Sequence, residues 1–290
     1  MKSGFVSIIG RPNVGKSTIL NALINQKVSI VTNKSQTTRD NIKGIYEDGE
    51  SQIIFVDTPG IHKPHHELGR LMNQSALAST SGVEVVVLVV DASKPFGDGD
   101  SYLFAELKVN CPLIIVLNKI DLATIDQVQG LKARYAELYP SATILEMSAI
   151  RSFNIEELIK IIKSHLSDGP RYYPVGSISD RDEQFFIKEL IREQVLMQLR
   201  EEVPHQIAVA VEKFQIKSKA VVVEALIIVD KPSQKAIVIG KDGARIKAIG
   251  IKAREALEAR YEKTTYLQLY VAIKKDWLNN PRLLKEYGYK

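Results

Sequence analysis

One short stretch of the sequence decides the fold, and it reads Gly10-Arg11-Pro12-Asn13-Val14-Gly15-Lys16-Ser17. It follows the apolar run Phe5–Ile9, which is typical of a buried strand, and it leads into a helical pattern over Lys16–Ile24. A glycine at each end lets the backbone curl, so that its N–H groups and the positive end of the helix face a phosphate group. The stretch therefore predicts a phosphate-binding loop between a strand and a helix.

The residues around this loop alternate buried strands with helices, which is the pattern of the α/β class. Apolar runs predict strands at 5–9, 42–46, 53–56, 83–90, 113–117 and 143–147. Helical spacing predicts helices at 16–24, 69–80, 102–107, 126–138 and 155–165. Because Asp48-Gly49 predicts a hairpin turn between 42–46 and 53–56, we expect a mixed sheet with helices on both faces.

A second domain follows a break in this pattern. Turn-forming residues cluster around 167–176, and they predict a domain at 1–168, a linker at 169–181 and a second domain at 182–290. Within the second domain, helices are predicted at 182–200, 233–239 and 244–260, and strands at 205–214, 220–229 and 266–272. This is an α+β module, with a C-terminal tail from Trp277 that docks or frays.

Composition excludes several classes of protein. No apolar run approaches the roughly 18 residues of a membrane-spanning helix, and the single cysteine, Cys111, excludes a disulfide within the chain. We therefore expect a cytoplasmic protein without a transmembrane segment. Residues 1–170 carry 17 Lys+Arg against 18 Asp+Glu, whereas residues 171–290 carry 22 against 16. The basic second half indicates either a polyanionic partner or a solvated basic face.

Two segments, the phosphate loop and Asp57–Gly60, predict how the phosphates and a Mg²⁺ ion are bound. Lys16 is expected to reach the β- and γ-phosphate oxygens, and the Ser17 hydroxyl to coordinate Mg²⁺. At the end of the predicted strand 53–56, the segment Asp57-Thr58-Pro59-Gly60 places a carboxylate where it can hold Mg²⁺ through a water molecule. The N–H group of Gly60 is expected near the γ-phosphate.

Two further motifs predict the nucleotide base. Asn118-Lys119-Ile120-Asp121 follows the predicted strand 113–117, and the Asp121 carboxylate can accept the two adjacent N–H donors of guanine, which adenine does not offer. Asn118 is expected to tie neighbouring loops together and the Lys119 stem to cover the base. Ser148-Ala149 follows the last strand, and the Ala149 N–H is expected to point at guanine O6.

The polar segment Gln36–Asp40 has the composition of a nucleotide-dependent switch. We favour Thr38 over Thr37 as the hydroxyl that completes the Mg²⁺ shell in the presence of a γ-phosphate. Lys16, Thr38 and Gly60 are thus the candidate catalytic residues, and hydrolysis is expected to be slow because Ile61 follows Gly60, where many GTPases place a water-orienting glutamine. Asn13 is a candidate for recruiting K⁺.

The second domain contains a GxxG stretch between a short and a longer predicted helix. Two glycines allow a sugar-phosphate backbone to approach the helix N-terminus, as in KH modules. The candidate RNA-binding residues in and after this stretch are Ile239, Gly240, Lys241, Asp242, Gly243, Arg245 and Lys247.

Taken together, these motifs resemble the bacterial Era GTPase family. The resemblance covers nearly the whole chain and rests on the phosphate loop, Gln36-Thr37-Thr38-Arg39, Asp57–Pro64, Asn118–Asp121 and Ala236–Lys241. It implies a Ras-like GTPase domain and a type II KH domain that binds near the 3′ end of 16S ribosomal RNA and acts in assembly of the 30S subunit. It also implies peripheral contact with the cytoplasmic face of the cell membrane.

Two positions depart from the family pattern: Ile150 stands where leucine is commoner, and Asp242 stands where glycine is frequent. The leading interpretation is a monomeric RNA-binding GTPase switch that uses GTP, GDP and Mg²⁺. Two alternatives remain open at this point. One is a non-catalytic RNA-binding assembly factor with structural GTP, and the other is a peripheral membrane GTPase whose basic half meets anionic lipid.

Overall fold

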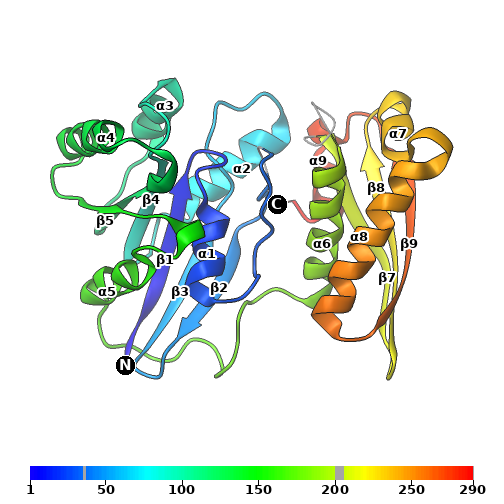
Figure 1. Cartoon of the computed structure of the whole chain (residues 1–290), viewed down its shortest axis with the longest axis horizontal. Coiled ribbons are helices and arrows are strands. Elements are labelled where there is room, and N and C mark those ends of the chain that lie inside the picture. The colour runs from blue at the N-terminus through cyan, green and yellow to red at the C-terminus, as the bar shows by residue number, and fades with distance from the viewer. Residues whose placement is uncertain (35–36, 200–205, 290) are drawn as a thin grey trace. The chain divides into compact units, whose positions relative to one another are not determined.

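The structure is a computed structural model that describes residues 1–34, 37–199 and 206–289. The chain divides into two compact units (Figure 1). The first unit comprises residues 1–31, 38–65 and 69–180, and the second is built mainly from residues 181–290. Three residues of predicted segments lie outside the described residues. They are Gln36 of the switch segment, Arg200 at the end of a predicted helix and His205 at the start of a predicted strand.

The first unit is built on a six-stranded sheet with the strand order β2-β3-β1-β4-β5-β6. The strands are β1 (Lys2–Gly10), β2 (Ile42–Glu47), β3 (Ser51–Asp57), β4 (Val85–Asp91), β5 (Leu113–Asn118) and β6 (Thr143–Glu146). Only β2 runs antiparallel to its neighbour, and every other pair is parallel. The predicted mixed sheet is confirmed, and its parallel strands all end at one edge.

Helices cover both faces of this sheet (Figure 1). They are α1 (Lys16–Ile24), α2 (Glu67–Ala78), α3 (Asp98–Glu106), α4 (Ile125–Leu138) and α5 (Ile155–His165), with short 3₁₀ turns η1 (Ile120–Leu122) and η2 (Ala149–Arg151). Apolar residues of α2, α3 and α4 share a core with Val86, Leu88 and Val90 of β4. Since α1 and α5 pack on the opposite face, β4 is buried on both sides, which explains its continuous apolar run.

The helix boundaries show where local signals outweigh periodicity. The predicted bounds of α1 and α5 are those of the structure, but α3 begins at Asp98 and not at the predicted residue 102. Asp98 and Asp100 lie in its first turn, where negative charge is favourable, and Asp100 Oδ2 accepts a hydrogen bond from the Gly97 amide at 3.0 Å. The acidic first turn extends the helix beyond its apolar stripe.

Residues 169–180, most of the predicted linker, belong to the first unit. This segment runs along the edge strand β2, where Ile45 N donates to Ile178 O at 3.0 Å and Ser179 Oγ donates to Lys43 O at 2.6 Å. Gln52 adds hydrogen bonds to the backbone of Tyr173. The boundary between the units falls between residues 180 and 181, because the edge strand supplies backbone partners that hold the segment.

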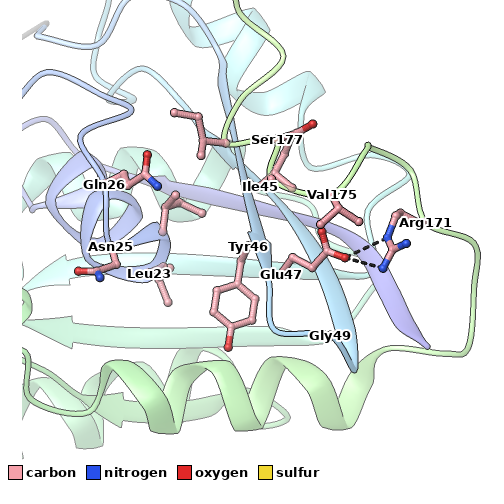
Figure 2. A pocket seen from close by; sticks show the side chains of 13 residues that line it. Leu23, Asn25, Gln26, Ile45, Tyr46, Glu47, Gly49, Arg171, Val175 and Ser177 are labelled. Carbon is pink, nitrogen blue, oxygen red and sulfur yellow. Dashed lines mark hydrogen bonds and ion pairs between the residues drawn. The ribbon is translucent and has the colours of Figure 1, made fainter. Parts of the chain in front are cut away.

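A cavity of about 540 Å³ lies between this segment, β2 and the end of α1 (Figure 2). Its wall includes Leu23, Ile45 and Val175, and Arg171 Nη2 pairs with Glu47 Oε1 at 2.7 Å at its rim. None of the predicted site residues lines this cavity.

The second unit contains a three-stranded sheet with helices on one face (Figure 1). In chain order its elements are α6 (Glu183–Gln198), β7 (Ala208–Ile216), β8 (Ala220–Val229), α7 (Pro232–Ile239), η4 (Lys241–Gly243), α8 (Ala244–Tyr261) and β9 (Thr264–Ile273). Strand β8 pairs antiparallel with β7 and parallel with β9. Residues of α6, α8 and the sheet form one buried core, as the α+β prediction requires.

The C-terminal tail docks on the second unit. It forms η5 (Trp277–Asn279) and α9 (Pro281–Glu286), and the Trp277 side chain is fully buried, so the tail docks and does not fray. Trp277 Nε1 donates to Gln206 O at 3.1 Å, which satisfies its only polar atom. Within the described ranges, no helix combines the length and the apolar character that a membrane span requires.

Candidate functional site

The phosphate loop joins β1 to α1 at the edge where the parallel strands end. Lys16 begins α1 and is 6% exposed, and its Nζ donates to Gly10 O at 3.2 Å and to Arg11 O at 2.9 Å. Burial lowers the pKa of Lys16 to about 8, against the opposing charge of Asp57. The cation is thus held inside the loop, in the position from which it would contact bound phosphate oxygens.

Gly15 is a position in the loop where any side chain would be strained. Its φ is +102°, and a Cβ there would stand 2.3 Å from Asn118 Nδ2. The loop therefore packs directly against the end of β5, where the base-binding motif begins.

Three predicted metal ligands converge beside the loop, and we call them the oxygen cluster: Ser17, Thr38 and Asp57. Ser17 Oγ donates to Asp57 Oδ2 at 2.7 Å and lies 2.9 Å from Thr38 Oγ1. The other candidate, Thr37, donates instead to Lys34 O at 2.7 Å within its own loop. The structure thus places the Thr38 hydroxyl, and not that of Thr37, in the cluster.

The oxygen cluster fits a Mg²⁺ ion. Asp57 is fully buried, and its Oδ1 has no hydrogen-bond partner among the residues that the structure describes. Burial raises the pKa of Asp57, opposed by the charge of Lys16 and by hydroxyl hydrogen bonds. An unpartnered buried carboxylate oxygen next to two hydroxyls is the hard oxygen donor set that Mg²⁺ prefers.

The segment after Asp57 lies against the phosphate loop. A Cβ at Gly60 would stand 2.6 Å from Pro12 Cα, and Ile61 N donates to Gly10 O at 3.1 Å. Thr58, predicted to bind nucleotide, uses its buried hydroxyl to donate to Ile8 O at 2.8 Å, so its side chain fastens β3 to β1. Ile61 is fully buried in the core and offers no polar group to a water molecule.

The predicted base pocket lies at the ends of β5 and β6. Asn118 is 2% exposed, and its Nδ2 donates to Val14 O at 2.8 Å while its Oδ1 accepts from Ala149 N at 3.1 Å. Asn118 therefore ties the two loops together as predicted. The Ala149 amide, which is expected to point at guanine O6, donates to the Asn118 oxygen in this structure.

Asp121 and Lys119 line the exposed side of the pocket. Ser148 Oγ donates to Asp121 Oδ1 at 2.5 Å, which orients the exposed carboxylate. Lys119 Nζ donates to Asn13 O at 2.5 Å and pairs with Asp91 Oδ2 at 2.7 Å. The Lys119 stem thus bridges β5 to the phosphate loop.

Sequence reasoning missed two residues at this site. Asp91 ends β4 and pairs with Lys119; partial burial alone would raise the pKa of Asp91, but hydrogen bonds from Lys119 and Ser93 lower it. Its place at the end of a buried strand was the signal that could have found it. Ser29 is 1% exposed and donates to Asp57 Oδ2 at 2.9 Å, and nothing in the local sequence marks it.

The candidate RNA site surrounds the junction of α7 and α8. Gly240 and Gly243 both have φ of +75°, and Asp242 between them has φ of +51°. Aspartate tolerates this left-handed conformation better than most residues, which accounts for its presence at an inner loop position. The side chains of the predicted polar contacts are exposed and so accessible to a ligand: Lys241, Asp242, Arg245 and Lys247.

The N-terminus of α8 follows directly from this loop. Arg245 Nη1 donates to Ile237 O at 2.7 Å, which holds the guanidinium against the end of α7. Ile239 is half-buried at the same helix end. The loop thus combines open backbone, a helix N-terminus and three exposed cations.

Comparisons with known proteins agree with both sites. Residues 5–119 match the family described as 50S ribosome-binding GTPase, and residues 202–278 match the KH domain family. The chain is 43% identical to GTPase Era of Clostridium kluyveri, over 100% of both chains. It belongs to the Era family of GTPases. The family accounts for the combination of a Ras-like nucleotide-binding unit with a C-terminal KH unit in one chain.

Two solved Era structures resemble this chain over its whole length. One, a complex with MgGDPNP and nucleotides 1506–1542 of 16S ribosomal RNA, is 36% identical, with a TM-score of 0.95. The other, an Aquifex aeolicus Era variant bound to GDP·AlF4⁻, is 37% identical, with a TM-score of 0.95. In both cases the match covers 100% of this chain and 99% of the other.

Proposed function

We propose that this chain is a GTP-hydrolysing switch that binds 16S ribosomal RNA near its 3′ end through its KH domain and acts in 30S subunit assembly in the cytoplasm. The observation that carries the proposal is the oxygen cluster, where Ser17, Thr38 and Asp57 meet beside the phosphate loop. The solved Era complex with MgGDPNP and 16S ribosomal RNA supports both halves of it.

Residues of the phosphate loop would hold the triphosphate. The backbone N–H groups of the loop, which Pro12 lacks, and the N-terminus of α1 would face the phosphates, while Lys16 would neutralise their charge. Ser17 and Thr38 would ligate Mg²⁺ directly, and Asp57 would act through a water molecule. When bound, Mg²⁺ supplies charge stabilisation at the β- and γ-phosphate oxygens.

The base pocket would select guanine through Asp121. Its carboxylate accepts N1–H and the 2-amino group together, and Ser148 keeps it in that orientation. Asn118 and Lys119 position the loops on either side of the base. Because Ala149 N already donates to Asn118, its contact with guanine O6 would be shared between two acceptors.

Catalysis would depend on electrostatic stabilisation by groups already in place. Lys16 and the Gly60 amide face the γ-phosphate, and Thr38 joins them when a γ-phosphate orders its segment. Because Ile61 is buried in the core, the side chain at this position does not orient the attacking water. We therefore expect slow intrinsic turnover. Asn13 remains a candidate for recruiting K⁺ to the loop.

The GxxG loop would bind the RNA backbone. Gly240 and Gly243 allow close approach, and Lys241, Arg245 and Lys247 screen phosphates from exposed positions. Asp242 adds a negative charge that repels phosphates, so the attraction for the RNA backbone comes from these three cations.

The test is GTP turnover with and without an RNA oligomer that ends in the 16S 3′ sequence. The chain is compared with Lys241→Ala and with Lys160→Ala, which removes an exposed lysine from α5 of the first unit. RNA is expected to accelerate GTP turnover in the unmodified chain and in Lys160→Ala. In Lys241→Ala, most of this acceleration should be lost. Equal acceleration in all three proteins would reject the GxxG loop as the RNA contact, and absence of GTP turnover would reject the switch.

A further inference from the structure

Asn21, on α1, holds the backbone of the two residues that follow the helix-terminal turn. Its Oδ1 accepts from Val28 N and Ser29 N, both at 2.9 Å, and its Nδ2 donates to Ser29 O at 2.7 Å. Three hydrogen bonds from one side chain fix the position of Ser29 relative to the helix that carries Ser17.

The Ser29 side chain points at the buried carboxylate of the oxygen cluster. Ser29 is 1% exposed, and its Oγ donates to Asp57 Oδ2 at 2.9 Å. The same oxygen accepts from Ser17 Oγ at 2.7 Å. Both donors therefore act on Oδ2, and Oδ1 is the carboxylate oxygen without a hydrogen-bond partner in the described part of the chain.

The two oxygens of the Asp57 carboxylate have different partners, and this fixes the orientation of the group. A carboxylate rotates about its Cβ–Cγ bond unless its oxygens are distinguished by their partners. Two donors on Oδ2 fix the rotation, so Oδ1 keeps its lone pairs for the metal shell. Hydrogen bonds of this kind orient metal-binding carboxylates, and their loss typically lowers metal affinity about 10- to 100-fold.

We propose that Ser29, held in place by Asn21, is a positioning residue that aims Asp57 at the Mg²⁺ of the nucleotide complex. The inference rests on the proposed function, because it needs a Mg²⁺–nucleotide complex at the oxygen cluster. Ser29 touches neither the metal nor the nucleotide, and it acts only through Asp57.

The test measures release of a fluorescent GDP analogue from the full chain as a function of Mg²⁺ concentration, which is a binding readout independent of turnover. Ser29→Ala is compared with Ser7→Ala, since Ser7 is also fully buried and its Oγ lies 2.8 Å from Ser79 Oγ in the same unit. Both variants lose one buried hydroxyl contact, but only Ser29→Ala alters the oxygen cluster.

We expect the Mg²⁺ concentration that half-maximally slows release to rise about tenfold in Ser29→Ala and to stay within about twofold in Ser7→Ala. Release in EDTA should be similar in the two variants, since the proposed role requires the metal. Ser29→Thr, which keeps the hydroxyl, should restore most of the Mg²⁺ response.

Asn21→Ala provides a second route to the same result, and it retains the Ser29 hydroxyl. It should shift the Mg²⁺ midpoint in the same direction, and the double variant should shift it by less than the product of the two single effects. Equal midpoints for Ser29→Ala and Ser7→Ala would overturn the inference alone. If Mg²⁺ failed to slow release from the unmodified chain, the inference and the proposed metal site would both be rejected.

Discussion

Replacing Asn118 with alanine should destabilise the first unit and open the base pocket. Asn118 is 2% exposed and makes buried hydrogen bonds to Val14 O at 2.8 Å and from Ala149 N at 3.1 Å. Asn118→Ala removes both bonds and leaves a buried carbonyl and a buried amide unpaired. At roughly 1 to 3 kcal/mol for each orphaned group, the loss of unfolding free energy is about 3 kcal/mol.

This loss converts to a change in melting temperature of about 9 °C, at roughly 3 °C per kcal/mol for a unit of this size. Scanning calorimetry is the assay, because it separates the transitions of two domains that need not unfold together. The control is Asn110→Ala, which removes an exposed asparagine from the loop before β5 and should change stability by less than about 0.5 kcal/mol.

A decrease of less than about 1 kcal/mol in Asn118→Ala would refute the reasoning. It would mean that water replaces both contacts, and that the two loops are held in register by other groups. GDP affinity is the second readout, and it should fall with the stability, since the same side chain positions the phosphate loop and the loop after β6.

Three further predictions test separate parts of the molecule. Thr38→Ala should raise the Mg²⁺ midpoint for nucleotide release on the order of tenfold, while Thr37→Ala should stay within about twofold, because only the Thr38 hydroxyl reaches the oxygen cluster. In competition titrations, Asp121→Asn should weaken GDP binding on the order of 100-fold and favour xanthosine diphosphate, because an amide N–H can donate to the O2 of xanthine whereas a carboxylate only accepts. Partial burial raises the pKa of Asp48, but hydrogen bonds, led by that from Lys163, outweigh it and hold the pKa well below its ordinary value. A carboxyl group of this kind stabilises the fold above its unfolded pKa of about 4, and the contribution is lost as pH falls below that value. Asp48→Asn should therefore cost about 1 kcal/mol in urea unfolding at pH 7, allowing for solvent screening, and less than half of that near pH 2.

Most of the candidate nucleotide site could be predicted from the sequence because the motifs follow buried strands. The phosphate loop follows β1 directly, and Asp57, Asn118 and Ser148 come at or just after the ends of other parallel strands. Those ends meet at one edge of the sheet. Motifs that are far apart in the sequence are therefore close together in the structure, and their places at strand ends predict this. The helix α1 was predicted to the residue for the same reason, since the phosphate loop fixes where it begins.

Contacts between loops could not be predicted in this way. Ser29 lies 28 positions from Asp57, and Asp91 lies 28 positions from Lys119, with no periodic pattern connecting either pair. The residues 169–180 were predicted as part of a linker because their composition favours turns. Composition does not reveal that the edge strand β2 offers them backbone hydrogen-bond partners, so the difference arises from tertiary pairing.

The proton count in the oxygen cluster fixes the direction of its hydrogen bonds and bears on the proposed role of Thr38. A serine hydroxyl has one proton, and a carboxylate only accepts, so Ser17 Oγ must donate to Asp57 and accept from Thr38. The Ser17 oxygen has two lone pairs, so a metal bound to one of them would leave the other for the Thr38 proton. In the proposed function, Thr38 would instead turn its own oxygen, 2.9 Å from Ser17 Oγ, toward the metal. Because the Ser17–Asp57 bond uses the single proton of Ser17, we expect Thr38, and not Ser17 or Asp57, to change its position when the metal and nucleotide bind.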